Sequence, residues 1–393
     1  MSQQVQHTVH LDVKHGGVND WLLMALFFLM LLTPIVAQGI GFSTDSTTEN
    51  RILAPFPKID SVREIKFLPK MSENYVNDRF GLRKQLVHFN SLVRYRLGLS
   101  STREVVVGKD GWLFYTADKL MEQHTGADVF TPVELENWVR QMEADRDWLA
   151  KRGIAFYIMI APDKNTIYPE KLPDYPHGAI TRIDQVAARL RNSDLEFIDP
   201  RAELFRVKAA GEMVYTPGDT HWAERGAFVA YQMLMDRMRK RYPSIVPLAL
   251  DDFKINYGQP MGADLAYILA LDGDIKYSVE RMTPTGESHQ IATQTTTFRP
   301  GWGWRITENK NDLQDRPRLL VFGDSFTDYV LGPTMLYETF RDPVWTHNNG
   351  GTFNFSLVKE IKPDIVLVQF AERYLHLVPL KPVGFDGPQA GGN

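Results

Sequence analysis

The residues with the clearest chemical potential are a serine, a histidine and an aspartate in two short motifs. Gly-Asp-Ser at 323–325 follows the apolar run 318–322, and Gly-Asp-Thr-His-Trp lies upstream at 218–222. A strand that ends in Gly-Asp-Ser and turns into a helix presents its serine at the carboxyl edge of a sheet, where open α/β sheets bind ligands. The Asp and the His supply the remaining members of a Ser-His-Asp set. The two motifs together predict an enzyme of acyl transfer.

In this interpretation Ser325 is the nucleophile, His221 the base and Asp219 the acid that orients the base. A serine hydroxyl is a weak nucleophile until a base removes its proton, and an imidazole base needs a carboxylate to fix its tautomer. Asp219 and His221 are two residues apart, so in extended backbone their side chains leave on the same face. The spacing leaves open whether the two touch. Each motif alone could instead cap the helix that follows it, but their joint occurrence at strand-to-helix junctions favours a site.

The order of apolar runs and amphipathic segments predicts an α/β fold. A helix begins at Pro132, and further helices are expected at about 182–191, 223–241 and 355–361, with strands at 154–160, 195–199, 318–322, 344–346 and 364–370. Strands that alternate with helices indicate a mostly parallel sheet covered on both faces. Residues 243–316 interrupt the alternation with polar, glycine and aromatic residues, and we expect an insertion there.

The N-terminal region predicts a membrane anchor. Residues 21–42 contain no charged side chain, and about twenty apolar residues are enough to cross a bilayer as a helix. A cleaved signal peptide is the alternative, but the apolar core is long and the Ile35/Ala37 cleavage site is poor. The expected organisation is a cytoplasmic segment at 1–20, an anchor at 21–42, a linker at 43–70, a catalytic domain at 71–380 and a flexible tail at 381–393. The body would lie on the periplasmic side of the inner membrane.

Composition removes several classes of function. The net charge of −4 argues against a general nucleic-acid binder, because binding to phosphates needs a basic face. The chain has no cysteine, which excludes disulfides, thiolate zinc sites and cysteine nucleophiles. We expect no metal and no cofactor.

The two motifs, together with Val-Gly-Lys-Asp-Gly-Trp-Leu-Phe at 107–114, resemble the alginate O-acetyltransferase family over about residues 50–380. Members of that family have a domain similar to SGNH hydrolases, are usually periplasmic and acetylate exported polysaccharides. The resemblance implies a three-layer fold and the same roles for Ser325, His221 and Asp219. It also implies the anchored type without a carbohydrate-binding module, and a multispanning membrane acyltransferase as the partner that donates the acetyl group.

The order of the motifs differs from that of ordinary SGNH hydrolases, in which the serine block comes first, so the resemblance implies a circularly permuted topology. By the same comparison the oxyanion hole would use the Ser325 amide and an amide near Gly350, in the loop that also holds Asn348. The asparagine block of the hydrolases is replaced by Ala-Glu-Arg-Tyr at 371–374. Arg373 could supply the missing donor or could pair with Glu372, and the sequence favours neither.

Aromatic side chains offer flat surfaces with a polar edge for sugars, and the candidates are Tyr267, Trp302, Trp304 and Tyr374. The prediction is therefore an O-acetyltransferase that moves an acetyl group through an acetyl-serine to a polysaccharide hydroxyl. One alternative is a polysaccharide acetyl esterase that uses the same triad. Another is a scaffold or polysaccharide-binding subunit of a secretion complex, without catalysis.

Overall fold

The computed structural model describes residues 18–40, 53–172, 174–258, 263–285, 293–299, 304–347 and 354–377. The chain divides into two compact units, residues 1–93 and 94–393. The predicted division at residue 71 is therefore not where the contacts separate. The predicted tail at 381–393 lies outside the described residues.

In the described residues of the first unit, the regular secondary structure is helical. The helices are α1 (Val18–Gly39), η2 (Val62–Phe67), α2 (Leu68–Arg79) and α3 (Arg83–Arg96), the last of which runs across the boundary between the units. The linker predicted at 43–70 thus includes helical turns from Val62 onward. No helix in the described parts of the chain is long and apolar enough to cross a membrane. The membrane anchor at 21–42 stays a prediction.

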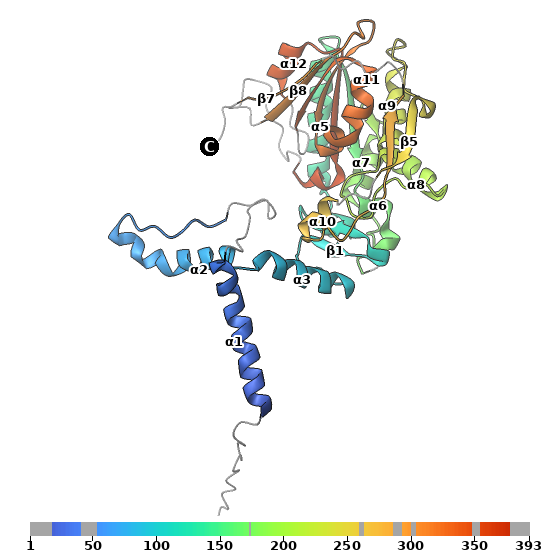
Figure 1. The fold of residues 1–393 in the computed structure, drawn as a ribbon. Coiled ribbons are helices and arrows are strands. Elements are labelled where there is room, and N and C mark those ends of the chain that lie inside the picture. The colour runs from blue at the N-terminus through green and yellow to red at the C-terminus, as the bar shows by residue number, and fades with distance from the viewer. Residues whose placement is uncertain are drawn as a thin grey trace, which may run out of the picture. The chain divides into compact units, whose positions relative to one another are not determined.

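The second unit is built on a seven-stranded sheet with the order β4-β3-β11-β9-β10-β8-β7. Neighbouring strands from β4 to β10 in this order are parallel. β8 is antiparallel to both of its neighbours, β10 and β7. The sheet is mixed because part of the predicted insertion joins it (Figure 1). The strands are β3 (Ala155–Ala161), β4 (Glu196–Ile198), β7 (Thr293–Arg299), β8 (Trp304–Lys310), β9 (Arg318–Gly323), β10 (Arg341–His347) and β11 (Ile365–Ala371).

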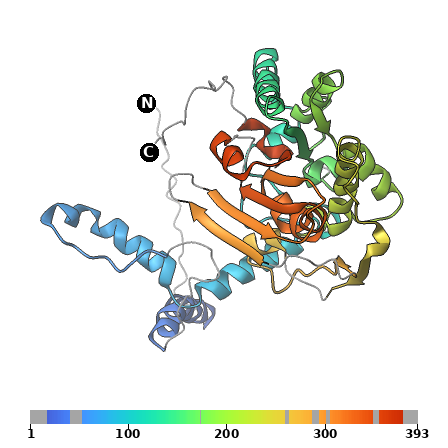
Figure 2. The same ribbon diagram turned by 90° about the horizontal axis from the view of Figure 1, so that it is seen from above.

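Alternate residues of the central strands point to opposite faces, and each face has its own core. Along β3, Tyr157 and Met159 lie in one core and Phe156 and Ile158 in the other. The first core is completed by α8 (Arg201–Ala209), α9 (Glu224–Met238) and the π-helix η6 (Thr327–Leu336). The second is completed by α5 (Pro132–Ala150), α7 (Arg182–Leu190) and α12 (Phe355–Ile361). Helices therefore cover both faces of the sheet, as predicted, and Figure 2 looks down on this arrangement.

The strand order follows a doubly wound pattern when the numbering starts at β9. Counting β9, β10 and β11 as strands 1, 2 and 3, and β3 and β4 as strands 4 and 5, gives the order 2-1-3-4-5. This is the order that the predicted circular permutation would produce. In such sheets the ligand site lies where the order reverses, between strands 1 and 3. The carboxyl ends of β9 and β11 are therefore the expected place for a site.

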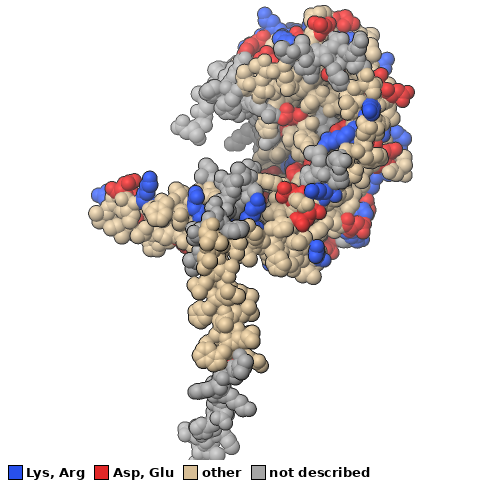
Figure 3. All heavy atoms as spheres, in the orientation of Figure 1, with Lys and Arg blue, Asp and Glu red and all other residues tan. Residues whose placement is uncertain are grey.

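Smaller elements flank the sheet. β1 (Val105–Val107) and β2 (Leu113–Tyr115) form an antiparallel hairpin. The predicted insertion also forms an antiparallel pair, β5 (Phe253–Tyr257) with β6 (Glu280–Pro284), and the short helix α10 (Asp264–Ile268). On the face of the second unit seen in Figure 3, acidic and basic side chains are interspersed. The remaining elements are η3 (Lys109–Gly111), α4 (Leu120–His124), α6 (Lys164–Ile167), η4 (Pro169–Lys171), η5 (Leu250–Asp252), α11 (Tyr337–Thr339) and η7 (Glu372–His376).

Candidate active site

Ser325 lies two residues beyond the end of β9, in the first turn of the helical segment that follows. The turn is tight: a Cβ at Gly323 would lie 2.8 Å from Thr327 Oγ1 and 3.1 Å from Trp345 Nε1. Asp324 is fully buried, and its carboxylate accepts hydrogen bonds from the amides of Phe326 (2.9 Å) and Ala371 (2.6 Å). Asp324 therefore joins the end of β9 to the end of β11. This leaves Ser325 at the carboxyl edge of the sheet, where the sequence places it.

His221 approaches Ser325 from a separate loop, which the isolated bridge between Tyr215 and Trp222 closes just before α9. Its Nε2 lies 2.8 Å from Ser325 Oγ. The neighbouring residues hold this approach, because Trp222 Nε1 donates a 3.1 Å hydrogen bond to the carbonyl of Phe326. The Trp222 ring also packs edge-on against the Phe326 ring at 5.2 Å. Residues 222 and 326 thus fix the separation of residues 221 and 325.

Asp219 contacts His221 directly, a point that the sequence left open. Its Oδ1 lies 2.7 Å from His221 Nδ1 and also accepts the His221 amide at 2.9 Å. With Nδ1–H donated to the carboxylate, Nε2 carries the lone pair that can accept the serine proton. The structure therefore brings all three predicted residues together in the order acid, base, hydroxyl.

Burial and charge act in opposite directions on these groups. Burial lowers the pKa of His221, but the hydrogen bond and the charge of Asp219, helped by the charge of Asp264, outweigh it and raise the pKa above its usual value. Burial raises the pKa of Asp219, but the hydrogen bond and charge of His221 outweigh it, so that the pKa is lowered. Each partner stabilises the charged form of the other, which is the condition for an imidazolium to form during a reaction.

Comparison with known proteins identifies the family. The family model described as an SGNH hydrolase-like domain, acetyltransferase AlgX, matches residues 105–358. The chain belongs to this family. It is 25% identical over 261 residues to the probable alginate O-acetylase AlgJ of Pseudomonas aeruginosa, which covers 65% of this chain and 63% of that protein. It is 27% identical over 176 residues to the protein of the same name from Pseudomonas syringae pv. tomato, covering 44% and 43%. The chain thus spans less than two thirds of the length of these relatives.

Solved structures agree with this fold. PatB1 of Bacillus cereus superimposes with a TM-score of 0.51 at 16% identity, over 71% of this chain and 99% of PatB1. A DHHW family protein from Eubacterium siraeum gives 0.50 at 14% identity, over 69% and 91%. These likenesses concern the fold alone.

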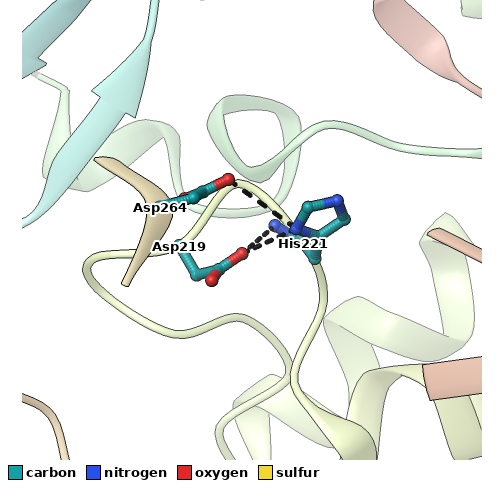
Figure 4. Close-up of side chains that lie close together, drawn as sticks. All are labelled: Asp219, His221 and Asp264. Carbon is teal, nitrogen blue, oxygen red and sulfur yellow. Dashed lines mark hydrogen bonds and ion pairs between the residues drawn. The ribbon is translucent and has the colours of Figure 1, made fainter. Parts of the chain in front are cut away.

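This AlgX-family chain has a second carboxylate beside the histidine that the sequence analysis did not find. Asp264, at the start of α10, lies 3.7 Å from His221 Nδ1 (Figure 4). It also accepts a 2.8 Å hydrogen bond from the Thr220 amide and a second one from the Thr220 hydroxyl. Burial and the charge of Asp219 raise its pKa. Asp264 lies far from Asp219 in the sequence, inside the predicted insertion, so no motif marks it.

Distances alone would allow a metal at this cluster. Asp219, His221 and Asp264 each offer one ligand atom within 4.8 Å of the others. The hydrogen bonds argue for a different use: Nδ1 of His221 is held by Asp219, and Nε2 faces Ser325. A metal bound at Nδ1 would have to displace the Asp219 contact that orients the ring. The donor set fits a proton-transfer site better.

Tyr329 is another residue that the sequence analysis missed. Its ring stacks on the imidazole of His221 at 5.3 Å with an interplanar angle of 20°, and 55% of the residue is exposed. It lies one turn beyond Ser325, inside the π-helix η6, and π-helical turns are frequent at functional sites. The sequence signal was present, because an aromatic residue follows the serine at helical spacing.

The partner of Arg373 is Asp163, not Glu372, which the sequence analysis considered. Its guanidinium pairs with buried Asp163, and Asp163 also accepts the Arg373 amide at 2.7 Å. Glu372 instead accepts the Asp163 amide (3.0 Å) and the Thr166 hydroxyl (2.7 Å). The alternative that Arg373 pairs with Glu372 is not what the described residues show, because Arg373 binds the carboxylate of Asp163 and Glu372 binds the Asp163 amide. The ion pair holds the end of β11 to the turn after β3.

The remaining candidates divide between packed and undescribed residues. Tyr374 is half-buried, packs against both cores and lies 5.2 Å from the Arg373 guanidinium, so it is mainly a packing residue. Tyr267 is in α10 and is 37% exposed. The predicted residues Trp302, Asn348 and Gly350, and the side chain of Trp304, lie outside the described parts.

Proposed function

We propose that this protein is an O-acetyltransferase that moves an acetyl group through Ser325 to a hydroxyl of an exported polysaccharide. The observation that supports this most is the imidazole of His221, hydrogen-bonded at one nitrogen to Asp219 and at the other to Ser325. Membership of an acetyltransferase family and similarity to proteins named alginate O-acetylase support the choice of acyl group.

In the first half-reaction Ser325 Oγ attacks the carbonyl carbon of the acetyl donor while His221 Nε2 takes the hydroxyl proton. The tetrahedral intermediate collapses, the bond to the leaving group breaks, and the leaving group receives the proton from Nε2. Ser325 then carries the acetyl ester. Asp219 stays ionised and stabilises the imidazolium, as expected for a carboxylate in this position.

In the second half-reaction a sugar hydroxyl approaches the acetyl-serine and gives its proton to His221 Nε2. The sugar oxygen attacks the carbonyl carbon, the ester bond to Ser325 breaks, and Oγ takes the proton back. The stacked ring of Tyr329 borders the imidazole and offers the acceptor sugar an amphipathic surface. If water takes the place of the sugar, the same residues perform an esterase reaction.

Charge that develops on the carbonyl oxygen needs hydrogen-bond donors. Ser325 is in the first helical turn after β9, where backbone amides carry partial positive charge. We propose the Ser325 amide as one donor, with an amide near Gly350 as the second. Arg373 is not proposed as a third, because Asp163 already binds its guanidinium.

The setting of the reaction is also a proposal. We infer a periplasmic catalytic unit held at the inner membrane by residues 21–42, with a membrane-bound acyltransferase as the donor partner and a polysaccharide as the acceptor. The names of the relatives make alginate one candidate acceptor.

The experiment that tests this function uses the purified full chain in detergent with a chromogenic acetyl ester. After rapid quenching, peptide mass spectrometry would locate the acetyl group, and Ser325→Ala would be the control. Acetyl on Ser325 that passes to an added oligosaccharide supports the transferase, and loss to water alone supports the esterase. Equal turnover by the folded Ser325→Ala variant would refute the assignment of the nucleophile and leave the scaffold alternative.

A further inference from the structure

The side chain of Lys164, in the short helix α6 that follows β3, is almost completely buried behind the candidate active site. Its Nζ donates hydrogen bonds to the carbonyls of Thr216 (3.2 Å), Pro217 (3.0 Å) and Asp219 (2.8 Å). All three acceptors belong to the loop that holds both Asp219 and His221. A single ammonium group thus binds three backbone carbonyls of that loop.

The turn at residues 162–164, which carries Lys164, also contacts the loop of His221 and the sheet edge near Ser325. The hydroxyl of Tyr215, at the start of the loop, donates to the carbonyl of Pro162. Asp163 pairs with Arg373 at the end of β11, next to the strand that leads to Ser325. Residues 162–164 therefore connect the loop of the base to the sheet edge of the nucleophile.

The chemistry of lysine suits this task. An ammonium has three N–H donors, which matches the three carbonyls in number, and a neutral amine has only two. The charged groups that face Nζ are the carboxylates of Asp219 and Asp264. The rings of Phe114 (5.3 Å) and Trp112 (5.8 Å) cover the ammonium on another side. Burial lowers the pKa of Lys164 to about 7, while the two carboxylates act to raise it.

We propose that Lys164 is a positioning residue, which holds residues 216–219 in the shape that places the Asp219 carboxylate against His221. It acts through Asp219 and touches no reacting atom. The inference rests on the proposed function, because it concerns the same histidine, but its central test does not depend on turnover.

The test is the pKa of the His221 imidazole in Lys164→Met, measured by NMR on selectively labelled histidine. If Lys164 positions Asp219, the variant loses the Asp219–His221 contact and the pKa of His221 falls. If Lys164 acts only through its charge, removal of a nearby cation favours the imidazolium, and the pKa rises. A fall supports the proposal; a rise or no change in the folded variant overturns it.

Steady-state kinetics of Lys164→Met give a second test of the proposal. We expect kcat on the chromogenic ester to fall about a hundredfold with little change in KM, as a misplaced catalytic group typically causes. Lys208→Met is the matched control, since Nζ of Lys208 also binds a carbonyl, that of Ile167 at 2.6 Å, but lies on α8 and contacts no part of the loop at 216–219 in the described structure.

Chemical rescue separates the ammonium from packing. Because the chain has no cysteine, Lys164→Cys can be alkylated with 2-bromoethylamine at that position alone, under denaturing conditions before refolding. The aminoethyl product restores an ammonium at nearly the original length and should restore both the His221 pKa and kcat, whereas iodoacetamide should not. Equal recovery with both reagents would overturn the proposal. If Lys164→Met fails to fold, Lys164→Gln replaces it, and an unchanged His221 pKa there would have the same meaning.

Failure of this inference is distinguishable from failure of the proposed function. Turnover that survives in Ser325→Ala would contradict the function, while the His221 pKa would still report on Lys164. An inactive Ser325→Ala variant with an unaltered Lys164→Met variant would contradict only the inference.

Discussion

At the scale of single residues, the reactivity of Ser325 depends on how His221 is held. The imidazole lies between a carboxylate and a hydroxyl, with 2.7 Å on one side and 2.8 Å on the other. Its ring is also stacked on Tyr329. Since the protein excludes most water from this ring, its hydrogen-bond partners decide its tautomer and its charge.

Replacing members of this set should abolish ester turnover without unfolding the protein. We expect Ser325→Ala or His221→Ala to lower kcat by about a million-fold, and Asp219→Asn by roughly ten-thousand-fold. The double variant of Ser325 and His221 should be no worse than either alone, because the two act as one unit. Steady-state kinetics with thermal melts as the folding control measure these effects. Additive losses in the double variant would show that the residues work separately.

The pH dependence of kcat/KM should report the ionisation of His221. The base must be neutral, and Asp219 raises its pKa above 6.5, so activity should rise with pH through a midpoint above that value. In Asp219→Asn the residual activity should have its midpoint at lower pH. The ionisation of His221 also affects the free energy of unfolding, because the pKa of His221 is higher in the folded protein than in the unfolded chain. The stabilisation by the protonated imidazole is fully present below the unfolded pKa and is lost as the pH rises through the folded pKa. Profiles with coincident midpoints in both proteins would contradict this account.

At the scale of elements, the site depends on two junctions. The turn from β9 into the helix presents Ser325, and it needs a residue without a side chain at position 323. The turn from β3 into α6 carries Asp163 and Lys164, which bind Arg373, just beyond β11, and the loop of His221 respectively. Both junctions lie at the carboxyl edge of the parallel strands.

Gly323→Ala tests the first junction. The added Cβ would lie 2.8 Å from Thr327 Oγ1 and 3.1 Å from Trp345 Nε1, so either these buried side chains or the backbone must shift. We expect a loss of about 1–3 kcal/mol in the free energy of unfolding, together with a clear loss of turnover. Gly273→Ala is the control, because its Cβ would meet nothing within 4 Å. Denaturant unfolding of both variants measures the difference, and equal stability would contradict the close packing described at Gly323.

Asp163→Asn tests the second junction. The side chains of Asp163 and Arg373 are only 3% and 6% exposed, so loss of one charge leaves the other buried without its partner. We expect a loss of about 3–5 kcal/mol in the free energy of unfolding. The double variant Asp163→Asn/Arg373→Met should recover part of this loss, since no unpaired charge remains. A double variant that loses the sum of both single effects would contradict the pairing.

At the scale of the whole molecule, the chain consists of two compact units. The exposed residues of α1 are largely apolar, whereas the visible face of the second unit has mixed charges (Figure 3). In the second unit, the order of the parallel strands gathers residues that are far apart in sequence. Ser325 follows β9, Arg373 follows β11 and Lys164 follows β3, and these strands are neighbours.

The proposed anchor gives a prediction at this scale. If residues 21–42 are an uncleaved anchor, the protein should stay in the membrane fraction after extraction with alkaline carbonate. Mass spectrometry should also find peptides from before residue 37 in the mature protein. An alkaline phosphatase fusion at the C-terminus should be active, since the body would be periplasmic. Release by carbonate together with a new N-terminus near Ala37 would support a cleaved signal peptide instead.

The sequence by itself determined the main elements and the identity of the proposed triad. Local patterns carried this information: buried parallel strands are continuous apolar runs such as 154–160, and the helix starting at Pro132 has a capping box at Thr131. The motifs at 218–222 and 323–325 each lie in a short stretch of chain, so their residue types were readable without the fold.

Only the tertiary structure decided how these parts meet. The second carboxylate of Asp264 and the partner of Arg373 come from segments that are distant in sequence. Asp219 and His221 are neighbours in sequence, but their contact depends on the shape of a loop that Lys164 binds from a distant segment. The mixed character of the sheet was also decided there, because β8 pairs antiparallel with β10, the last of the parallel strands, through long-range backbone hydrogen bonds. Lys164 shows the reason most clearly: its acceptors are backbone carbonyls, which every residue has, so no side-chain pattern in the sequence could mark them.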